Sequence, residues 1–565
     1  MPHEQFLATV AQGVAAVVSQ SERCKNRHLR ECARDWIASM NPDQPGEIAS
    51  RYLAILAVGI LLISLVGVSA QPSTVTNPPA RLEIPVGQRQ LFLDDFGIER
   101  IDKLTRTLHS PAKKGAVIRP NWERGETALQ TRSAPAWDPA TGVYKLWMIT
   151  SATHSGTTYA ESEDGLHWRK PSLRQRVVNG SLENNTVTWD PALEWPANAM
   201  ENVVYDPDDV DPSRRFKGFS HCFMREPIVS PDGIHWRKLN VPALASSDES
   251  NLSYDRQTRT FIATLKHNGP NGRSVFLSTS TDFEHWTAQA LMFHADDLDQ
   301  MLGRGNISRH YTSPGLDPPI FNIPADYHVD IYNMGVFRYE GIYIGLPSVY
   351  HKTGQVPGDW AGFVDWDVSA EQRVAYRQSG DWAGFHHVQL TCSRDLHEWK
   401  RLGDRRPFLD LSPMGSGAYD LSTIIGPSSP VVRGDELWFY YTGLKKYGGP
   451  TPQRGVERDQ GAICLAVLRR DGFVSLDAGD KPGSVTTQLF KLPAGELHLN
   501  ADTSRGFVQA ALLDASGHVR CETSSMTGDY LRGRVTWTTP LPGTNSEVRL
   551  RLTARRAALF SYWFD

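Results

Sequence analysis

The heptapeptide SEDGLHW at residues 162–168 decides the fold, because close copies of it recur along the chain. The copies are SPDGIHW (230–236), STDFEHW (280–286) and SRDLHEW (393–399), and RRDGF (469–473) keeps the Asp-Gly turn without the tryptophan. Each copy follows a strand-like run such as SVFLST, and an earlier strand-turn-strand element such as NLSYDRQTRTFIATL precedes it. Repeated units of short strands and tight turns are typical of β-propellers, so the repeat predicts five blades.

The aspartate and the tryptophan of each box have a structural interpretation. An aspartate in a tight turn accepts hydrogen bonds from its own backbone, and the tryptophan that follows can pack between sheets. Catalytic groups are not expected once in every blade. We therefore assign the boxes to the scaffold and look for the chemistry elsewhere.

The pattern changes after residue 485, where seven short alternating runs are separated by turn signals. Such runs are typical of an antiparallel β-sandwich. No long amphipathic helix is expected after residue 70. The predicted fold class is all-β, with a five-bladed β-propeller (86–484), a C-terminal antiparallel β-sandwich (485–565) and an N-terminal hydrophobic helix.

Residues 52–70, YLAILAVGILLISLVGVSA, carry no charge and follow Arg51. Nineteen residues of helix span about 28 Å, close to the thickness of a bilayer core. The segment is either a signal peptide or a transmembrane anchor, and we expect everything after the linker 71–85 to be exported: periplasmic, extracellular or membrane-anchored. Residues 1–51 are then a cytoplasmic tail, or an extension of the gene model upstream of a start at Met40.

The composition excludes some partners and cofactors. Lys and Arg number 59 against 63 Asp and Glu, a net charge of −4, and nucleic-acid binders usually carry a basic excess. The chain has no Gly-x-Ser-x-Gly elbow, no phosphate-cradling loop and no His-Glu-x-x-His helix. We expect no cofactor and no catalytic metal. The acidic stretches DPDDVDP (206–212) and HADDLD (294–299) leave structural calcium open.

Six stretches carry a resemblance to a known group: LFLDDFGIER (91–100), NWERGE (121–126), YAESEDGLHWRKP (159–171), DIYNMGVFRYEGIYIGLPS (330–348), CSRDLHEWKR (392–401) and LAVLRRDGFVSL (465–476). With the repeat and the C-terminal sandwich, residues 86–565 resemble the five-bladed propeller glycoside hydrolases, in particular exported bacterial proteins of the family-32-like group. Invertases, levansucrases, arabinanases, xylosidases and some glycoside phosphorylases share this architecture. The invertase motifs Trp-Met-Asn-Asp-Pro-Asn-Gly, Arg-Asp-Pro and Glu-Cys are absent from residues 86–484. No catalytic residue can therefore be transferred by motif.

The resemblance implies that catalytic carboxylates stand where the innermost strands begin. Cleavage of a glycosidic bond needs one protonated carboxyl group and one carboxylate. The candidates for this pair are Glu201, Glu249, Asp330, Asp94 and Asp95. The candidates for substrate binding are Glu126, Arg132, Asp248, His386 and Trp122. His387 is a further candidate for bonding sugar hydroxyls, Asp326 and Asp420 are further acids at strand starts, and the other loop tryptophans that could stack on sugar rings are Trp195, Trp360, Trp366 and Trp382.

These observations predict a glycoside hydrolase that acts on an oligo- or polysaccharide, binds no nucleic acid, and meets a membrane only through residues 52–70 if that segment is retained. Two alternatives stay open. One is a glycan-binding propeller without catalysis. The other is a glycoside phosphorylase, for which Arg132, Arg338 and His386 are the candidates that would bind phosphate.

Overall fold

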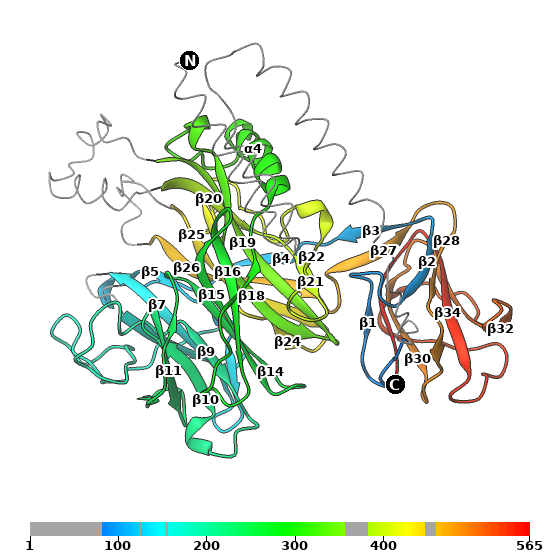
Figure 1. Cartoon of the computed structure of the whole chain (residues 1–565), viewed down its shortest axis with the longest axis horizontal. Coiled ribbons are helices and arrows are strands. Elements are labelled where there is room, and N and C mark those ends of the chain that lie inside the picture. The colour runs from blue at the N-terminus through cyan, green and yellow to red at the C-terminus, as the bar shows by residue number, and fades with distance from the viewer. Residues whose placement is uncertain (1–81, 125, 153–155, 356–381, 447–458) are drawn as a thin grey trace, which may run out of the picture. The chain divides into compact units, whose positions relative to one another are not determined.

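The computed structural model describes residues 82–124, 126–152, 156–355, 382–446 and 459–565, and these residues form mainly antiparallel β-sheets (Figure 1). The all-β prediction is confirmed. The expected tail 1–51, the hydrophobic segment 52–70 and the linker as far as residue 81 lie outside the described residues. Within the described ranges, no helix is both long and apolar enough to cross a membrane.

The largest sheet joins both ends of the repeat region. Its main path runs β23-β25-β26-β5-β7-β6, with β24, β4 and β8 paired at its sides. The early strand β4 pairs antiparallel with the late strand β26, and Gly461 of β26 also meets Ala128 of β5 in parallel. The strands are β4 (Ala112–Ile118), β5 (Glu126–Gln130), β6 (Ala136–Asp138), β7 (Val143–Ala152), β8 (Gly156–Ser162), β23 (Thr423–Ile425), β24 (Val431–Arg433), β25 (Glu436–Leu444) and β26 (Gly461–Arg469).

Three further antiparallel sheets follow one another along the chain. The first has the order β12-β11-β10-β9 with β13 at its side, the second β14-β15-β16-β17, and the third β18-β19-β21-β22 with β20 at its side. The strands are β9 (Asn202–Tyr205), β10 (Phe216–Ser220), β11 (Met224–Ser230), β12 (Arg237–Lys238), β13 (Leu244–Ala245), β14 (Ser250–Asp255), β15 (Thr260–Gly269), β16 (Gly272–Ser280), β17 (Ala290–Phe293), β18 (His328–Tyr339), β19 (Ile342–Gln355), β20 (Trp382–Val388), β21 (Thr391–Ser393) and β22 (Lys400–Arg401).

Two six-stranded sheets enclose a separate apolar core, and they include strands that the sequence did not assign to them. The sheets have the orders β3-β27-β35-β30-β33 with β1, and β2-β28-β34-β31-β32 with β29. In Figure 1 the blue strands β1 to β3 lie among the orange and red strands. The strands are β1 (Gln90–Leu91), β2 (Ile98–Asp102), β3 (Leu104–Leu108), β27 (Val474–Ala478), β28 (Gly483–Thr487), β29 (Phe490–Lys491), β30 (Leu497–Asp502), β31 (Phe507–Leu513), β32 (Val519–Glu522), β33 (Asp529–Arg534), β34 (Glu547–Arg555) and β35 (Ala557–Phe564).

The expected boundary at residue 485 therefore does not coincide with these sheets. β3 pairs with β27 from Leu104 to Leu108, and β27 in turn pairs with β35. A short, half-buried alternating strand such as β3 completes a sheet only with distant partners, and nothing in its own pattern names them. The two sheets combine residues 90–108 with residues 474–564.

The repeated boxes form the predicted turns. The Asp164 carboxylate accepts hydrogen bonds from the backbone N–H groups of Leu166 and His167, both at 2.8 Å. The Trp168 indole donates to the Gly165 carbonyl at 2.9 Å. The same bonds to the turn aspartate recur at Asp232, Asp282 and Asp395. The structural interpretation of the boxes is confirmed.

Among the described residues one long helix follows residue 70, α4 (Asp297–Thr312), and it is not amphipathic, so the expectation that no long amphipathic helix occurs there is not contradicted. Its polar residues lie on every side, so the sequence shows no amphipathic stripe. Asp296 caps the helix in a reciprocal capping box with Asp299, and Arg405 pairs with both carboxylates. The acids of 294–299 thus begin a helix. The short 3-10 turns are η1 (Trp122–Arg124), η2 (Pro212–Arg214), η3 (Pro324–Asp326) and η4 (Gly403–Arg405).

Candidate functional site

Buried carboxylates stand where neighbouring strands begin. Glu201 and Glu249 directly precede β9 and β14, and Asp330 is the third residue of β18. Their relative exposures are 2%, 3% and 5%. β14 contacts both β9 and β18. The structure therefore brings these three predicted residues into one region, as the strand starts led us to expect.

Arg132, which follows β5, joins two of these carboxylates. Its Nε lies 2.5 Å from Glu249 Oε2, its Nη2 bonds the other oxygen of Glu249, and its Nη1 lies 3.3 Å from Glu201 Oε2. Arg225 Nη1 lies 3.3 Å from the second oxygen of Glu201. Burial raises the pKa of Glu201, because Arg132 only partly offsets the loss of water and the Glu249 carboxylate adds repulsion. These four side chains form the buried part of a charged cluster.

Asp248 is a more exposed carboxylate of the same charged cluster. Its side chain is 44% exposed, and its Oδ2 accepts from the buried Lys266 ammonium at 2.9 Å and from the Tyr332 hydroxyl at 3.4 Å. The same ammonium lies 3.6 Å from the centre of the Tyr332 ring. Partial burial opposes ionisation of Asp248, but Lys266 and the two arginines outweigh it and lower its pKa. Asp248 is a carboxylate at neutral pH.

The pKa of Asp330 is shifted in the opposite direction to that of Asp248. The Asp330 side chain is 7% exposed, Arg273 Nη1 lies 3.1 Å from its Oδ2, and its Oδ1 has no hydrogen-bond partner among the described residues. Burial raises the pKa of Asp330, and Arg273 only partly offsets that effect. The Arg273 guanidinium carbon lies 5.8 Å from the Tyr332 ring centre, so Asp330 and Asp248 flank the same aromatic residue.

The charged cluster thus holds two carboxyl groups whose environments move their pKa values apart. Such a pair is the arrangement that separates a proton donor from a proton acceptor at one pH. His386 belongs to the aromatic wall beside it, with its ring centre 4.6 Å from those of Tyr332 and Tyr350. The members of the cluster are Arg132, Glu201, Arg225, Asp248, Glu249, Lys266, Arg273, Asp330 and Tyr332.

Asp94 and Asp95 do not belong to this cluster. Asp94 pairs with Arg394, whose Nε lies 2.8 Å from its Oδ2, and Asp95 pairs with Arg106 and Lys400. Lys400 lies on the edge strand β22, far along its sheet from β18. The segment that holds Asp94 and Asp95 leads into β2 and β3 of the two six-stranded sheets.

Glu126 and Trp122 form a second polar region at the start of β5. Glu126 is buried, pairs with Lys170, and accepts from the Asn121 N–H at 2.7 Å. Trp122 is 41% exposed and lines an open cavity of about 440 Å³ with Trp168 and Lys170. Asp420 is likewise occupied, by Lys113 at 2.6 Å.

Of the loop tryptophans, Trp195 is 44% exposed, Trp382 begins β20, and Trp360 and Trp366 lie outside the described residues. The second acidic stretch that left calcium open is also occupied, because the Lys217 ammonium lies 2.8 Å from Asp206 and 2.7 Å from Asp209. Within the described ranges, no group of three or more His, Cys, Asp or Glu side chains is placed to hold a metal ion.

Sequence reasoning found Arg132 but missed the other cations of the cluster and one aromatic ring; these are Arg225, Lys266, Arg273 and Tyr332. Lys266 stands in the apolar run FIATLKH and Arg225 in FMREPIV, where each is almost fully buried. A charged residue inside an apolar strand is a signal, because charges are buried only when they are paired. That signal could have found Arg225 and Lys266, and it does not identify Tyr332.

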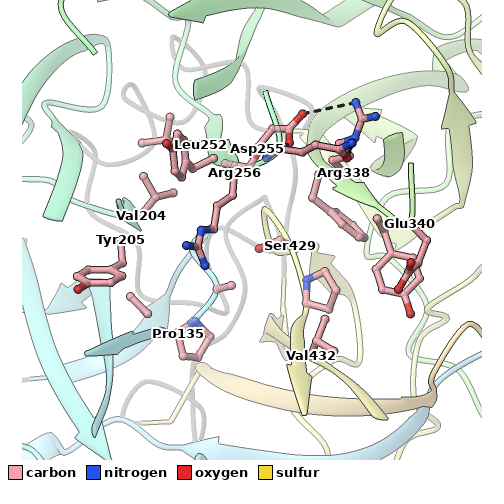
Figure 2. A pocket seen from close by; sticks show the side chains of 18 of the residues that line it. Pro135, Val204, Tyr205, Leu252, Asp255, Arg256, Arg338, Glu340, Ser429 and Val432 are labelled. Atoms are coloured by element: carbon pink, nitrogen blue, oxygen red, sulfur yellow. Dashed lines mark hydrogen bonds and ion pairs between the residues drawn. The ribbon is translucent and has the colours of Figure 1, made fainter. Parts of the chain in front are cut away.

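The other end of the same strands opens into a cavity of about 580 Å³ (Figure 2). Tyr205 ends β9, Asp255 ends β14, and Arg338 stands next to the end of β18. None of the carboxylates at the strand starts lines this cavity. Arg338 pairs there with Asp255 at 3.6 Å, so it does not join Arg132 and His386.

Buried histidines lie behind the charged cluster on β19 and β20. The ring centres of His351 and His387 are 4.7 Å apart, and His351 stacks on Phe385 at the same distance. Burial lowers the pKa of His387 to about 4 and holds the pKa values of His351 and His386 well below 6.5. All three are therefore neutral in the folded protein at neutral pH.

We expect the free energy of unfolding to fall as the pH drops from 6.5 towards 4. In that window the unfolded chain binds a proton on His387 and the folded chain does not, so acid favours unfolding. The gap between 6.5 and about 4 corresponds to about 3 kcal/mol for this residue. His387→Phe should remove that part of the pH dependence in urea unfolding curves recorded near neutral pH and in the acid window. Equal acid sensitivity of the His387 variant and the unsubstituted protein would contradict the argument.

No protein-family model matches the chain, and no curated protein matches it. Among solved structures, one titled "Glycoside hydrolase" is 11% identical over 64% of this chain and 92% of its own, with a TM-score of 0.36. The GH32 beta-fructofuranosidase of Bombyx mori is 9% identical over 81% and 94%, with a TM-score of 0.35. A structure titled for the GH130 family of mannoside phosphorylases, and for glycoside hydrolases within it, is 15% identical over 67% and 96%, with a TM-score of 0.35. The chain is similar to these three proteins in the course of its backbone over the matched residues.

Proposed function

We propose that the chain is a glycoside hydrolase whose repeat region forms a five-bladed β-propeller. β4 pairs with β26, and β26 meets β5, so the last sheet of the repeat region takes in strands from its start. Each sheet of the repeat region also contacts the next one. The contacts join β6 with β9, β9 with β14, β14 with β18 and β20 with β23. This succession supports a closed ring in which β5, β9, β14, β18 and β23 are innermost.

One observation carries the proposed chemistry. Beside Tyr332, the pKa of Asp248 is lowered and the pKa of Asp330 is raised. Glycosidic cleavage needs a protonated carboxyl group at the leaving oxygen and a carboxylate at the sugar. Asp330, with its raised pKa, gives its proton to the leaving oxygen. Asp248, with its lowered pKa and 44% exposed side chain, acts as the base or the nucleophile. The buried Glu201 and Glu249 hold Arg132 and Arg225 in place as positioning residues.

The backbone at Asp248 supports this assignment. Its φ is 145°, a region that favours glycine, so an aspartate there costs energy. Arg225 bonds the Asp248 carbonyl and holds that conformation. Strained residues kept in place by buried partners cluster at active sites, where they aim a reactive group.

Two features favour hydrolysis over phosphorolysis and over binding alone. Arg132 is fully engaged by Glu249 and Glu201, and Arg338 lies at the far cavity, so the phosphate candidates do not converge. A binding module would have no need of two carboxyl groups in opposite protonation states. We further propose that residues 52–70 direct export, on the strength of their hydrophobic sequence.

A panel of oligo- and polysaccharides tests the function. The full chain should release new reducing ends from at least one glycan, at the same rate with and without inorganic phosphate. A sugar phosphate formed only in the presence of phosphate would identify a phosphorylase. Binding of a glycan without cleavage of any would identify a binding protein, and either result would overturn the proposal.

A further inference from the structure

The cavity of about 580 Å³ at the far ends of β9, β14 and β18 is a site distinct from the charged cluster. Asp255 lies six positions after Glu249 along β14, which is about 20 Å of extended chain. The cavity volume falls within the range of small-molecule sites. A ligand held here would therefore not touch Asp248 or Asp330.

Two cations and two acids line the cavity, and the acids are already engaged. Asp255 is buried and accepts from the backbone N–H of Gln257 at 3.0 Å, and Glu340 accepts from the Arg89 N–H at 2.9 Å. Arg338 is held by Gln257 at 3.0 Å and lies 3.6 Å from Asp255. Both carboxylates therefore accept hydrogen bonds from protein groups.

Arg256 is the more exposed of the two cations that line the cavity. Its side chain is 67% exposed, and in Figure 2 it extends across the middle of the cavity. Its Nε and Nη2 each lie 3.4 Å from one oxygen of Asp208, a long two-point contact at the surface that is worth less than about 1 kcal/mol. An incoming carboxylate can displace that contact at small cost and form a shorter, bidentate pair with the guanidinium.

The rest of the lining suits a ring that carries hydroxyl groups. Tyr205, Gln257 and Ser429 offer hydroxyl and amide groups, while Pro430 and Val432 supply apolar surface. Hydroxyl-rich rings with an apolar face are characteristic of sugars, and aromatic and apolar walls accept that face.

We propose that this cavity binds a carboxylate-bearing saccharide, with Arg256 pairing to the sugar carboxylate. The site is separate from the proposed catalytic centre and does not depend on hydrolysis. Its specificity comes from charge, because a neutral sugar of the same shape forms no ion pair with the guanidinium.

Calorimetric titration of the full chain with glucuronate and with glucose tests the proposal. Glucuronate should bind at least about tenfold more tightly than glucose, and Arg256→Ala should weaken glucuronate binding by about tenfold or more. Arg259→Ala removes the same charge from the same turn outside the cavity lining and should leave binding unchanged. Asp248→Asn should also leave it unchanged, which separates this site from the catalytic proposal.

Four results would overturn the proposal: no glucuronate binding at millimolar concentrations, equal binding of glucose and glucuronate, unchanged binding by the Arg256 variant, or loss of binding on Asp248→Asn. Because Arg256 is exposed, its replacement is not expected to unfold the chain, and a circular dichroism spectrum checks this.

Discussion

Asp248→Asn and Asp330→Asn should each lower kcat/KM on the cleaved glycan by about 10³-fold, within the range that general acid–base groups contribute. The asparagine keeps the size of the side chain and removes its ability to exchange a proton. Asp330 must be protonated to act, so activity falls as the pH rises through its pKa. Asp248 must be ionised, so activity falls as the pH drops through its pKa. Initial rates over a pH series measure both limbs, and each variant should lose one of them.

Asp95→Asn is the matched control for this pair. The chemical change is the same, but Asp95 is 64% exposed and pairs with Arg106 and Lys400 outside the charged cluster. Its kcat/KM should stay within about twofold of the unsubstituted protein. Retention of activity by both Asp248→Asn and Asp330→Asn on a glycan that the chain cleaves would refute the assignment of the acid and the base while leaving the hydrolase activity itself in place.

Arg132→Met should destabilise the protein by about 3–5 kcal/mol, the usual cost of breaking a buried ion pair from one side. The arginine is 1% exposed and bonds both oxygens of Glu249 as well as one oxygen of Glu201. Its loss removes the cation that pairs with the buried Glu249 carboxylate, because Arg225 pairs with Glu201 rather than with Glu249. Urea unfolding at neutral pH measures the change.

A double variant separates charge from packing in this prediction. Arg132→Met with Glu249→Met replaces the pair by apolar side chains and should recover much of the lost stability. Arg394→Met makes the same substitution at an arginine that is 40% exposed and should cost less than about 1 kcal/mol. If the single Arg132 variant is no less stable than the Arg394 variant, the buried network is not a source of stability.

The sequence was sufficient for features whose cause is local. The Ser-x-Asp box forms its turn through hydrogen bonds within five residues, so its copies could be recognised without any knowledge of the sheets. The acids at strand starts were also predictable, because a polar residue directly before an apolar strand marks where that strand enters. Glu201, Glu249 and Asp330 were found in this way.

Features made by distant partners could not be predicted. β3 has the same alternation as any edge strand, and its pairing with β27 follows from the closing of the whole sheet. The roles proposed within the cluster also depend on distant partners. Both oxygens of Glu249 are held by Arg132, from the segment after β5, whereas the more exposed Asp248 is held by Lys266, and the sequence names neither partner.

The pairing of β4 with β26 has a consequence for how the protein is made. Ile118 meets Ile463, so a strand that emerges early from the ribosome has to wait for a partner translated much later. At roughly 10 residues per second, that wait is on the order of half a minute. During it the nascent chain exposes an unpaired edge, a condition under which chaperones commonly protect polypeptides from aggregation. Truncation before residue 461 is expected to leave β4 without a partner, however complete the intervening sheets are.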